Sequence, residues 1–265
     1  MSTSHHGDGL NNDKVSCLVV TADRKELLRR SLHSYKNQTH PNKEVVVVDN
    51  GHVRVDDLLA DFDSEEVKYI RIEPSPENIL GELRNISLEH ATGDYLTCWD
   101  DDDWFHPERI EVELQTLKQG YDACCLTGNL FHIDTDEFMN HPYRGALPNG
   151  SPSSIMHRRN SKIRYPSLRR EEDTVYLDKW RDRKRYKSLD LSYSYLFVRV
   201  FHGTNVSGKK HFLRRLKNTP ASWLQYMWHA KIKNDIFEHP KFKLTEKERE
   251  SFKLFMKDSK KFGLL

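Results

Sequence analysis

The chain has 265 residues, and its 42 Lys and Arg against 40 Asp and Glu give a formal net charge of +2. This length is enough for one α/β domain with a sizeable core and does not require a second domain. A content of 37% hydrophobic and 11% aromatic residues excludes a disordered chain, and the small net charge gives no argument for a polyanionic partner.

Residues 1–14 are polar and lack the apolar core of a signal peptide, and no apolar run is long enough to span a bilayer. We therefore expect a flexible leader over 1–14, no transmembrane segment and a cytoplasmic protein. The four cysteines lie in apolar, strand-like runs without Cys-x-x-Cys spacing, which predicts buried reduced thiols.

The first elements form a β-α-β pattern. The β-branched runs at 15–20 and 45–48 are typical of strands buried on both faces. A helix is predicted between them, with Asp23 as its N-cap, Glu26 three residues later, and Pro41 beyond its end.

Strands and helices continue to alternate toward the middle of the chain. The hydrophobic pattern predicts them in turn at 67–72, 77–91, 94–99, 107–120 and 121–126. This alternation predicts a Rossmann-like, mainly parallel sheet sandwiched by helices.

The periodicity weakens after residue 127, and Gly, Pro, Asn and Ser become frequent, so loops are expected to dominate over 128–164. Further elements are predicted as a helix at 171–187, a strand at 191–200, and helices at 220–234 and 244–261.

Four consecutive aspartates at 100–103 follow the strand at 94–99 directly. Their carboxylates repel one another, and a hard divalent cation with oxygen ligands is the simplest way to neutralise them. Open α/β sheets bind ligands at the carboxyl ends of their strands, so Thr21, Asp49 and the aspartates should converge on one crevice.

Two other interpretations of the aspartates follow from their position before a helix. A solvated acidic loop in front of the next helix remains open, because carboxylates are favoured near helix N-termini. A calcium-binding loop is rejected, because Phe105 stands where such a loop requires Gly and Pro107 interrupts it.

Four segments, in this order and spacing, resemble the family 2 glycosyltransferases with the GT-A fold. They are VSCLVVTADRKELLRRSLHSYKNQTHPNKEVVVVDNG (15–51), GELRN (81–85), ATGDYLTCWDDDDWFHPERIE (91–111) and YPSLRREEDTVYLDKW (165–180). The resemblance implies a single GT-A domain with a nucleotide-sugar-binding half (15–127), an acceptor-binding and catalytic half (128–219) and a C-terminal helical tail (220–265).

The resemblance also implies an activity. It is the metal-dependent, inverting transfer of a sugar from a nucleoside diphosphate sugar, preferably a uridine one, to an acceptor hydroxyl. Mn²⁺ or Mg²⁺ would neutralise the charge that develops on the departing diphosphate.

By the same resemblance, Thr21 and Asp49 would border the nucleotide base, although each could instead be a strand-end cap. Arg84 would lie near the base or the phosphates. Its alternative is a helix-surface arginine paired with Glu82 or Glu89.

The DxD pattern of the family maps onto the aspartates. Asp100 would approach the ribose or the metal, and Asp102 would bind the metal that bridges the diphosphate. Asp101 and Asp103 share these roles, because four aspartates in a row leave the register open by one. His202 would lie on the metal or the diphosphate, since imidazole suits Mn²⁺.

Glu172 and Asp173 match the Glu-Asp motif of the family. Asp173 would take the proton of the acceptor hydroxyl, with Glu172 beside it in the acceptor site. The alternative is a pair of acidic charges at the N-terminus of the helix that starts near 171.

The acceptor is left open as a glycan or a small or lipid-linked hydroxyl. Basic stretches at 158–187 and 209–217 form a candidate anion-binding surface and favour, as an alternative, a hydroxylated base of DNA. A nucleotidyltransferase or a non-catalytic sugar-nucleotide-binding module is the other alternative. The segment after the first strand has no glycine, which counts against a nucleotidyltransferase and excludes a dehydrogenase.

Overall fold

The computed structural model describes residues 13–205 and 208–265. The predicted leader at 1–14 therefore lies outside the described residues, except for its last two. No helix in these two ranges is long and apolar enough to cross a membrane.

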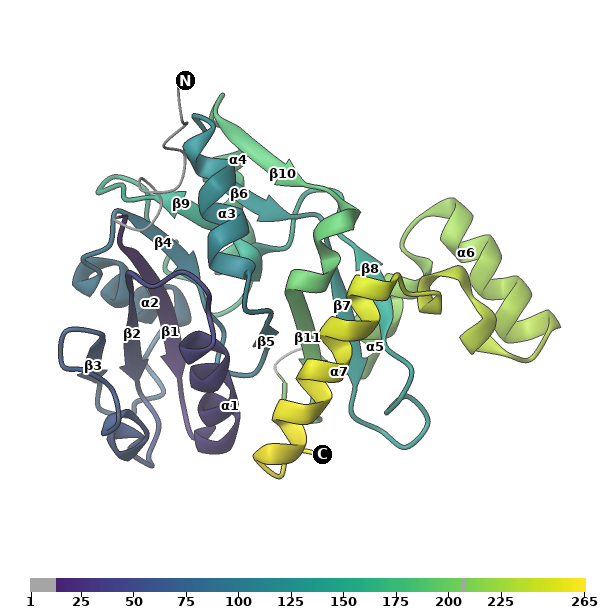
Figure 1. Ribbon diagram of the computed structural model, residues 1–265, viewed down its shortest axis with the longest axis horizontal. Coiled ribbons are helices and arrows are strands. Elements are labelled where there is room, and N and C mark those ends of the chain that lie inside the picture. The colour runs from purple at the N-terminus through teal and green to yellow at the C-terminus, as the bar shows by residue number, and fades with distance from the viewer. Residues whose placement is uncertain (1–12, 206–207) are drawn as a thin grey trace, which may run out of the picture.

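A seven-stranded sheet forms the larger part of the molecule (Figure 1). In spatial order its strands are β10 (Tyr186–Leu189), β6 (Ala123–Leu126), β9 (Met156–Arg158), β4 (Tyr95–Cys98), β1 (Val15–Thr21), β2 (Lys43–Asp49) and β3 (Val67–Arg71). All neighbours are parallel except β9, which runs antiparallel to both β4 and β6. The predicted mainly parallel sheet is thereby confirmed.

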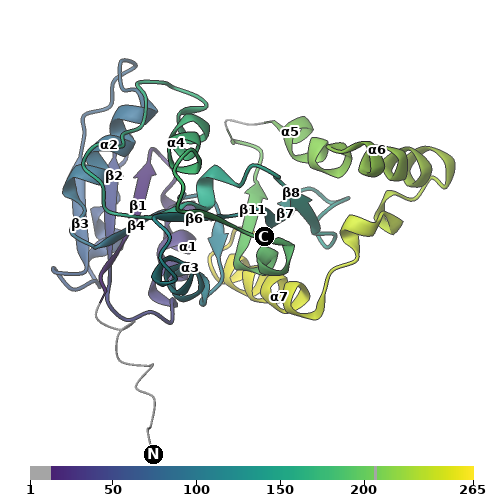
Figure 2. The same ribbon diagram turned by 90° about the horizontal axis from the view of Figure 1, so that it is seen from above.

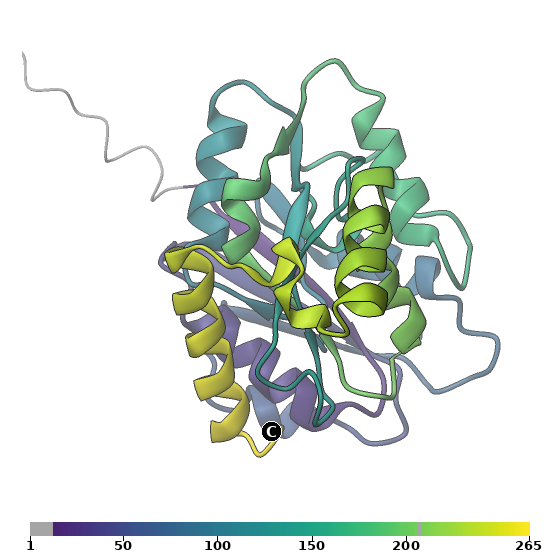
Figure 3. The same ribbon diagram turned by 90° about the vertical axis from the view of Figure 1, so that its right-hand side faces the viewer.

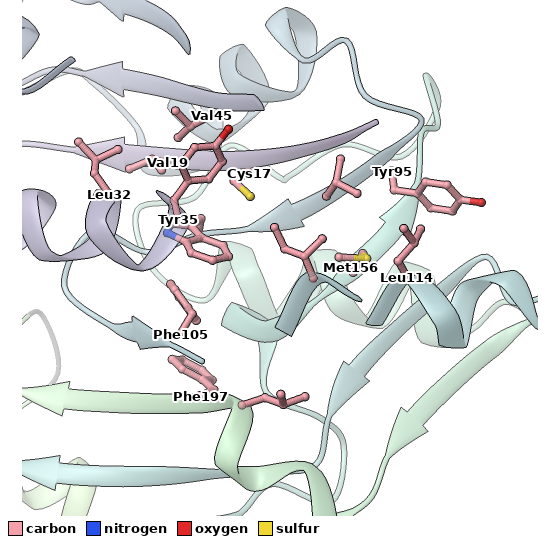
Figure 4. Close-up of a cluster of buried hydrophobic side chains, with 14 of the residues drawn as sticks. Cys17, Val19, Leu32, Tyr35, Val45, Tyr95, Phe105, Leu114, Met156 and Phe197 are labelled. Carbon is pink, nitrogen blue, oxygen red and sulfur yellow. The ribbon is translucent and has the colours of Figure 1, made fainter. Parts of the chain in front are cut away.

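Helices cover both faces of this sheet (Figure 2). On one face lie α1 (Lys25–Lys36) and α3 (Arg109–Lys118), and on the other α2 (Leu80–His90) and α4 (Glu172–Arg181). The side chains of β1 alternate between the two faces. Cys17 and Val19 pack with Leu32 of α1, as Figure 4 shows, whereas Leu18 packs with Leu88 of α2. The strand is apolar at successive positions because both of its faces are buried.

A second sheet corrects the expectation that loops dominate over 128–164. Its order is β5 (Trp104–Phe105), β11 (Phe197–Phe201), β7 (Gly128–Ile133) and β8 (Tyr143–Ala146). The strand predicted at 191–200 begins as a 3₁₀ helix, Leu191–Leu196, and becomes extended only at Phe197. These strands are short and pair with distant segments, so they leave little periodic signal in the sequence.

The C-terminal part is helical, as predicted. It contains α5 (Lys209–Arg214), α6 (Pro220–Met227), which continues as a π-helical turn, Trp228–Ile232, and α7 (Glu246–Lys261). Figures 1 and 3 show that α6 projects from the end of the molecule and that α7 lies along the second sheet. Trp104 Nε1 donates to Asp258 of α7 at 2.9 Å, and Phe255 is fully buried, so α7 is a packed helix of the domain.

The turn before α1 differs from the prediction. The N-cap residue of α1 is Arg24, not Asp23, and it makes no side-chain capping bond. Asp23 has a positive φ of 55° and accepts a hydrogen bond from the backbone N–H of Val53 at 2.9 Å. Its carboxylate ties this turn to the segment after β2, so it is not available to the helix.

The four cysteines are free and buried, which confirms the prediction for these thiols.

Candidate active site

A cavity of about 980 Å³ opens at the carboxyl ends of β1 and β4 and extends to the second sheet. Thr21 and the aspartates 100–103 line it from the first sheet, Glu172 and Asp173 from the start of α4, and Arg199 from β11. The predicted convergence of Thr21 and the aspartates is confirmed. This position follows from the topology, because the ends of neighbouring parallel strands meet at one edge of the sheet.

Arg84 joins the aspartates to the predicted catalytic pair. Its Nη2 lies 3.0 Å from Asp100 Oδ1 and its Nε 3.2 Å from Glu172 Oε1, while its side chain is only 12% exposed. The alternative pairing with Glu82 or Glu89 is therefore wrong. Burial would raise the pKa of Asp100, but Arg84 and a hydrogen bond from Ser153 bring that pKa below its usual value.

The segment before α4 is held against α2 by the GELRN residues. A Cβ on Gly81 would lie 1.9 Å from the carbonyl oxygen of Pro166, so only glycine permits this approach. The side chain of Asn85 donates to the Tyr165 carbonyl at 3.0 Å and accepts from the Tyr165 N–H at 2.9 Å. The backbone at Glu171 then turns through a positive φ of 64° into α4.

Glu172 and Asp173 both lie in the first turn of α4 but have different surroundings. Glu172 is 3% exposed and bound to Arg84, and burial raises its pKa although Arg84 acts to lower it. Asp173 is half-buried, and its Oδ1 accepts from the N–H of Thr174 at 2.7 Å. Its Oδ2 has no hydrogen bond within the described part of the chain, so this oxygen is available on the cavity wall.

Asp101 and Asp102 are held by residues from three segments. Thr21 Oγ1 donates to Asp101 Oδ2 at 2.7 Å, and Arg24 Nη1 lies 3.2 Å from both carboxylates. His202 Nε2 lies 3.3 Å from Asp102 Oδ2. Arg24 was not predicted from the sequence, because it precedes a helix and belongs to no periodic pattern.

Two of the four aspartates lie in surroundings that disfavour their ionised form. Burial, followed by the charge of Asp102, raises the pKa of both Asp101 and Asp103. Asp103 is 2% exposed and accepts a hydrogen bond from the N–H of Val200 at 3.0 Å. A bound cation would relieve this repulsion, because it favours the ionised carboxylates.

The donor atoms of the predicted metal ligands fit a divalent cation only in part. Asp102 Oδ2 and His202 Nε2 lie close enough to act as one oxygen and one nitrogen ligand, a set suited to Mn²⁺. Asp100 is bound to Arg84, and within residues 13–205 and 208–265 no three His, Cys, Asp or Glu side chains gather as a metal site. Further ligands would have to come from a substrate or water.

Asp49 does not face the cavity. It is fully buried at the end of β2, where its Oδ1 accepts from the N–H of Gly51 at 2.9 Å. Its Oδ2 accepts from the Tyr69 hydroxyl at 2.7 Å and lies 2.9 Å from Arg71 Nη1. These bonds join the ends of β2 and β3, and the predicted contact of Asp49 with a nucleotide base stays a prediction.

Several arginines of the basic stretch at 158–187 bind carbonyl or carboxylate groups of the protein. Arg158 and Arg159 donate to backbone carbonyls, and Arg183 and Arg185 both bind Asp122. Both basic stretches contribute to the cavity wall, 158–187 through Arg169, Arg170 and Arg181 and 209–217 through Arg214 and Arg215. The anion-binding surface expected from these stretches stays a prediction.

Asn205 was missed by the sequence analysis. Its Nδ2 donates to Asp102 Oδ2 at 3.3 Å and to the Val200 carbonyl at 2.9 Å, which fixes the turn after β11 beside the aspartates. In the sequence, the only indication of a role for Asn205 at this site was its position three residues after His202.

Curated relatives share the sequence pattern over part of their length. GlyA, a glycosyltransferase of Streptococcus pneumoniae, is 28% identical over 49% of this chain, and the match covers 18% of GlyA. The putative glycosyltransferase EpsH of Bacillus subtilis is 29% identical over 38% of this chain and is covered to 30%. An uncharacterized glycosyltransferase of Haemophilus influenzae is 25% identical over 64% of this chain and is covered to 72%.

Solved structures share the fold. TarS of S. aureus, residues 1–349, in complex with UDP-GlcNAc has a TM-score of 0.58 at 16% identity, covering 94% of this chain and 80% of that one. The predicted GT-A type is thereby confirmed. The sequence model of the family described as "Glycosyl transferase family 2" matches residues 16–215, and the chain therefore belongs to this family.

Proposed function

We propose that this chain transfers a sugar from a nucleoside diphosphate sugar to an acceptor hydroxyl, with inversion and with the help of Mn²⁺ or Mg²⁺. The observation that carries the proposal is the Arg84 bridge. It brings Asp100 on the nucleotide side and Glu172, next to the candidate base, into one cavity.

The donor proposed is a uridine diphosphate sugar. TarS, which shares the fold, has been solved in complex with UDP and with UDP-GlcNAc. Thr21, Arg84, Asp100 and Asp101 line the cavity at the strand ends, where α/β sheets bind nucleotides. The volume of about 980 Å³ is large enough for such a ligand.

Asp102 and His202 are the residues that would hold the metal. When bound, the ion would supply positive charge to the leaving diphosphate. Arg24, which contacts both Asp101 and Asp102, holds these two carboxylates beside the proposed metal ligands.

Asp173 is proposed as the base. In an inverting displacement the acceptor oxygen forms a bond to the anomeric carbon while the bond to the diphosphate breaks, and the hydroxyl proton passes to Asp173. The unengaged Oδ2 of Asp173 supports this role. Glu172 is less suited to it, because Arg84 already binds its carboxylate.

The acceptor is proposed to be a glycan or a small or lipid-linked hydroxyl compound. The alternative acceptor is a hydroxylated base of DNA, which the basic stretches at 158–187 and 209–217 favour. Part of the first stretch binds groups of the protein itself, which makes this alternative the weaker one.

The test measures release of nucleoside diphosphate from a panel of sugar nucleotides, with Mn²⁺ and with chelator. We expect turnover of one donor, lost in Asp102→Ala. Asp173→Asn, an isosteric change, should retain UDP affinity and lose turnover, because it removes only the proton acceptor. Binding of UDP without turnover of any donor would favour a non-catalytic module, and failure to bind any nucleotide would refute the proposal.

A further inference from the structure

Three arginines that line the cavity form no ion pair with a carboxylate of the described residues. Arg199 comes from β11, Arg214 ends α5 and Arg215 begins the turn that follows.

Other arginines of the same cavity differ in this respect. Arg24 and Arg84 bind the aspartates, and Arg181 lies 2.9 Å from Asp178. The unmatched positive charge of the cavity thus comes from the three arginines together with Arg169 and Arg170, which also line it and form no ion pair among the described residues.

His211 is the polar side chain that Arg214 and Arg215 contact. Its Nδ1 lies 3.4 Å from Arg214 Nη2 and its Nε2 3.3 Å from Arg215 Nη2. Burial and the charges of Arg215, Arg199 and Arg214 lower the pKa of His211 to about 4. The ring is then neutral at pH 7 and has a single acceptor nitrogen, so it satisfies at most one guanidinium.

Arg215 is the most constrained of the three. Its Nε is buried with no hydrogen-bond partner among the described residues, and burial together with Arg199 and Arg214 lowers its pKa. Behind it, Lys241 Nζ donates to the Arg215 carbonyl and to Asn218 Oδ1. An unpaired buried donor and clustered positive charge are both relieved by a bound anion.

Arg199, Arg214 and Arg215 line the same cavity as Asp173 and the aspartates 100–103. An anion held by the three arginines would thus lie in the cavity that also contains the candidate base and the donor side. Guanidinium groups suit the oxygens of a phosphate, because each can donate two parallel hydrogen bonds to them.

Building on the proposed function, we propose that Arg199, Arg214 and Arg215 bind a phosphate group of the acceptor. The acceptor class is then a hydroxyl compound that also carries a phosphate monoester or diester, with its hydroxyl at Asp173.

The test measures the binding of sn-glycerol 3-phosphate and of UDP separately, by calorimetry in the presence of Mg²⁺. In Arg214→Gln and Arg215→Gln we expect the affinity for glycerol 3-phosphate to fall roughly tenfold or more, since each change removes a charge-assisted hydrogen bond. UDP affinity should stay within about twofold of wild type. Arg181→Gln is the matched control, because this arginine lines the same cavity but already has Asp178, and it should leave glycerol 3-phosphate binding unchanged.

Circular dichroism of each variant checks the fold, and Arg214, which is exposed, gives a readout that does not depend on burial. The proposal is overturned if wild type does not bind glycerol 3-phosphate. It is also overturned if Arg214→Gln and Arg215→Gln weaken UDP and spare glycerol 3-phosphate, because the arginines then serve the donor diphosphate. A third result would separate the two proposals: the arginine variants lose glycerol 3-phosphate binding, but the protein binds no nucleotide. The anion site would then stand, and the proposed transferase function would be refuted.

Discussion

Replacing Arg84 with Met should destabilise the protein by leaving two carboxylates without their cation. The side chains of Arg84, Asp100 and Glu172 are 12%, 18% and 4% exposed. Removing one partner from a buried ion pair costs about 3–5 kcal/mol. Since Asp100 keeps some contact with water, we expect the lower end of that range, about 3 kcal/mol at pH 7.

The loss of stability in Arg84→Met should depend on pH, because the folded and unfolded states of the variant bind different numbers of protons. Without Arg84, the folded-state pKa values of Asp100 and Glu172 rise above those of the unfolded chain. The folded variant then binds more protons than the unfolded one, so its stability falls as the pH rises from about 4–4.5 through the raised values. In the wild type the pKa of Asp100 is lowered, so this group increases the stability of the folded protein as the pH rises. The difference in the free energy of unfolding between wild type and variant should thus be larger at pH 8 than at pH 5.

Urea unfolding of both proteins at pH 5 and pH 8, with midpoint and slope fitted, measures the effect. The double variant Arg84→Met with Glu172→Gln should recover part of the lost stability at pH 8, because it removes one of the two unpaired charges; Glu172→Gln alone is the control. An equal loss at both pH values, or no recovery in the double variant, would refute the electrostatic explanation and point to lost packing of the arginine side chain.

Two further predictions concern packing and burial. Gly81→Ala should cost about 1–3 kcal/mol in thermal unfolding and reduce turnover, because the new methyl group would push Pro166 and the segment leading to α4 away from α2. Gly208→Ala, whose methyl would meet no atom within 4 Å, is the control, and an equal effect of both changes would contradict this reasoning. The four cysteines should react with Ellman's reagent at pH 8 only after unfolding, because they are buried and burial raises the pKa of Cys125, for example, to about 11; rapid labelling of the folded protein would disprove this.

The sequence by itself determined the elements whose signal is local. The β-branched runs of β1 and β2 and the apolar periodicity of α1 and α3 predicted the parallel half of the sheet, because side chains buried on both faces of a strand must be apolar. The position of the aspartates directly after β4 then placed them at the ligand-binding edge. For the same reason Thr21 was correctly expected beside them.

The tertiary structure alone decided the features that depend on pairing between distant segments. Strand β9 has three residues and is held in the sheet only by pairing with β4 and β6, so no periodic pattern in the sequence predicts it. Arg84 and Glu172 are 88 positions apart, and their contact depends on the close approach of Pro166 to Gly81. Asp49 was predicted to face a ligand, yet the side chains of the neighbouring strand bind it, because a fully buried carboxylate requires partners within the protein.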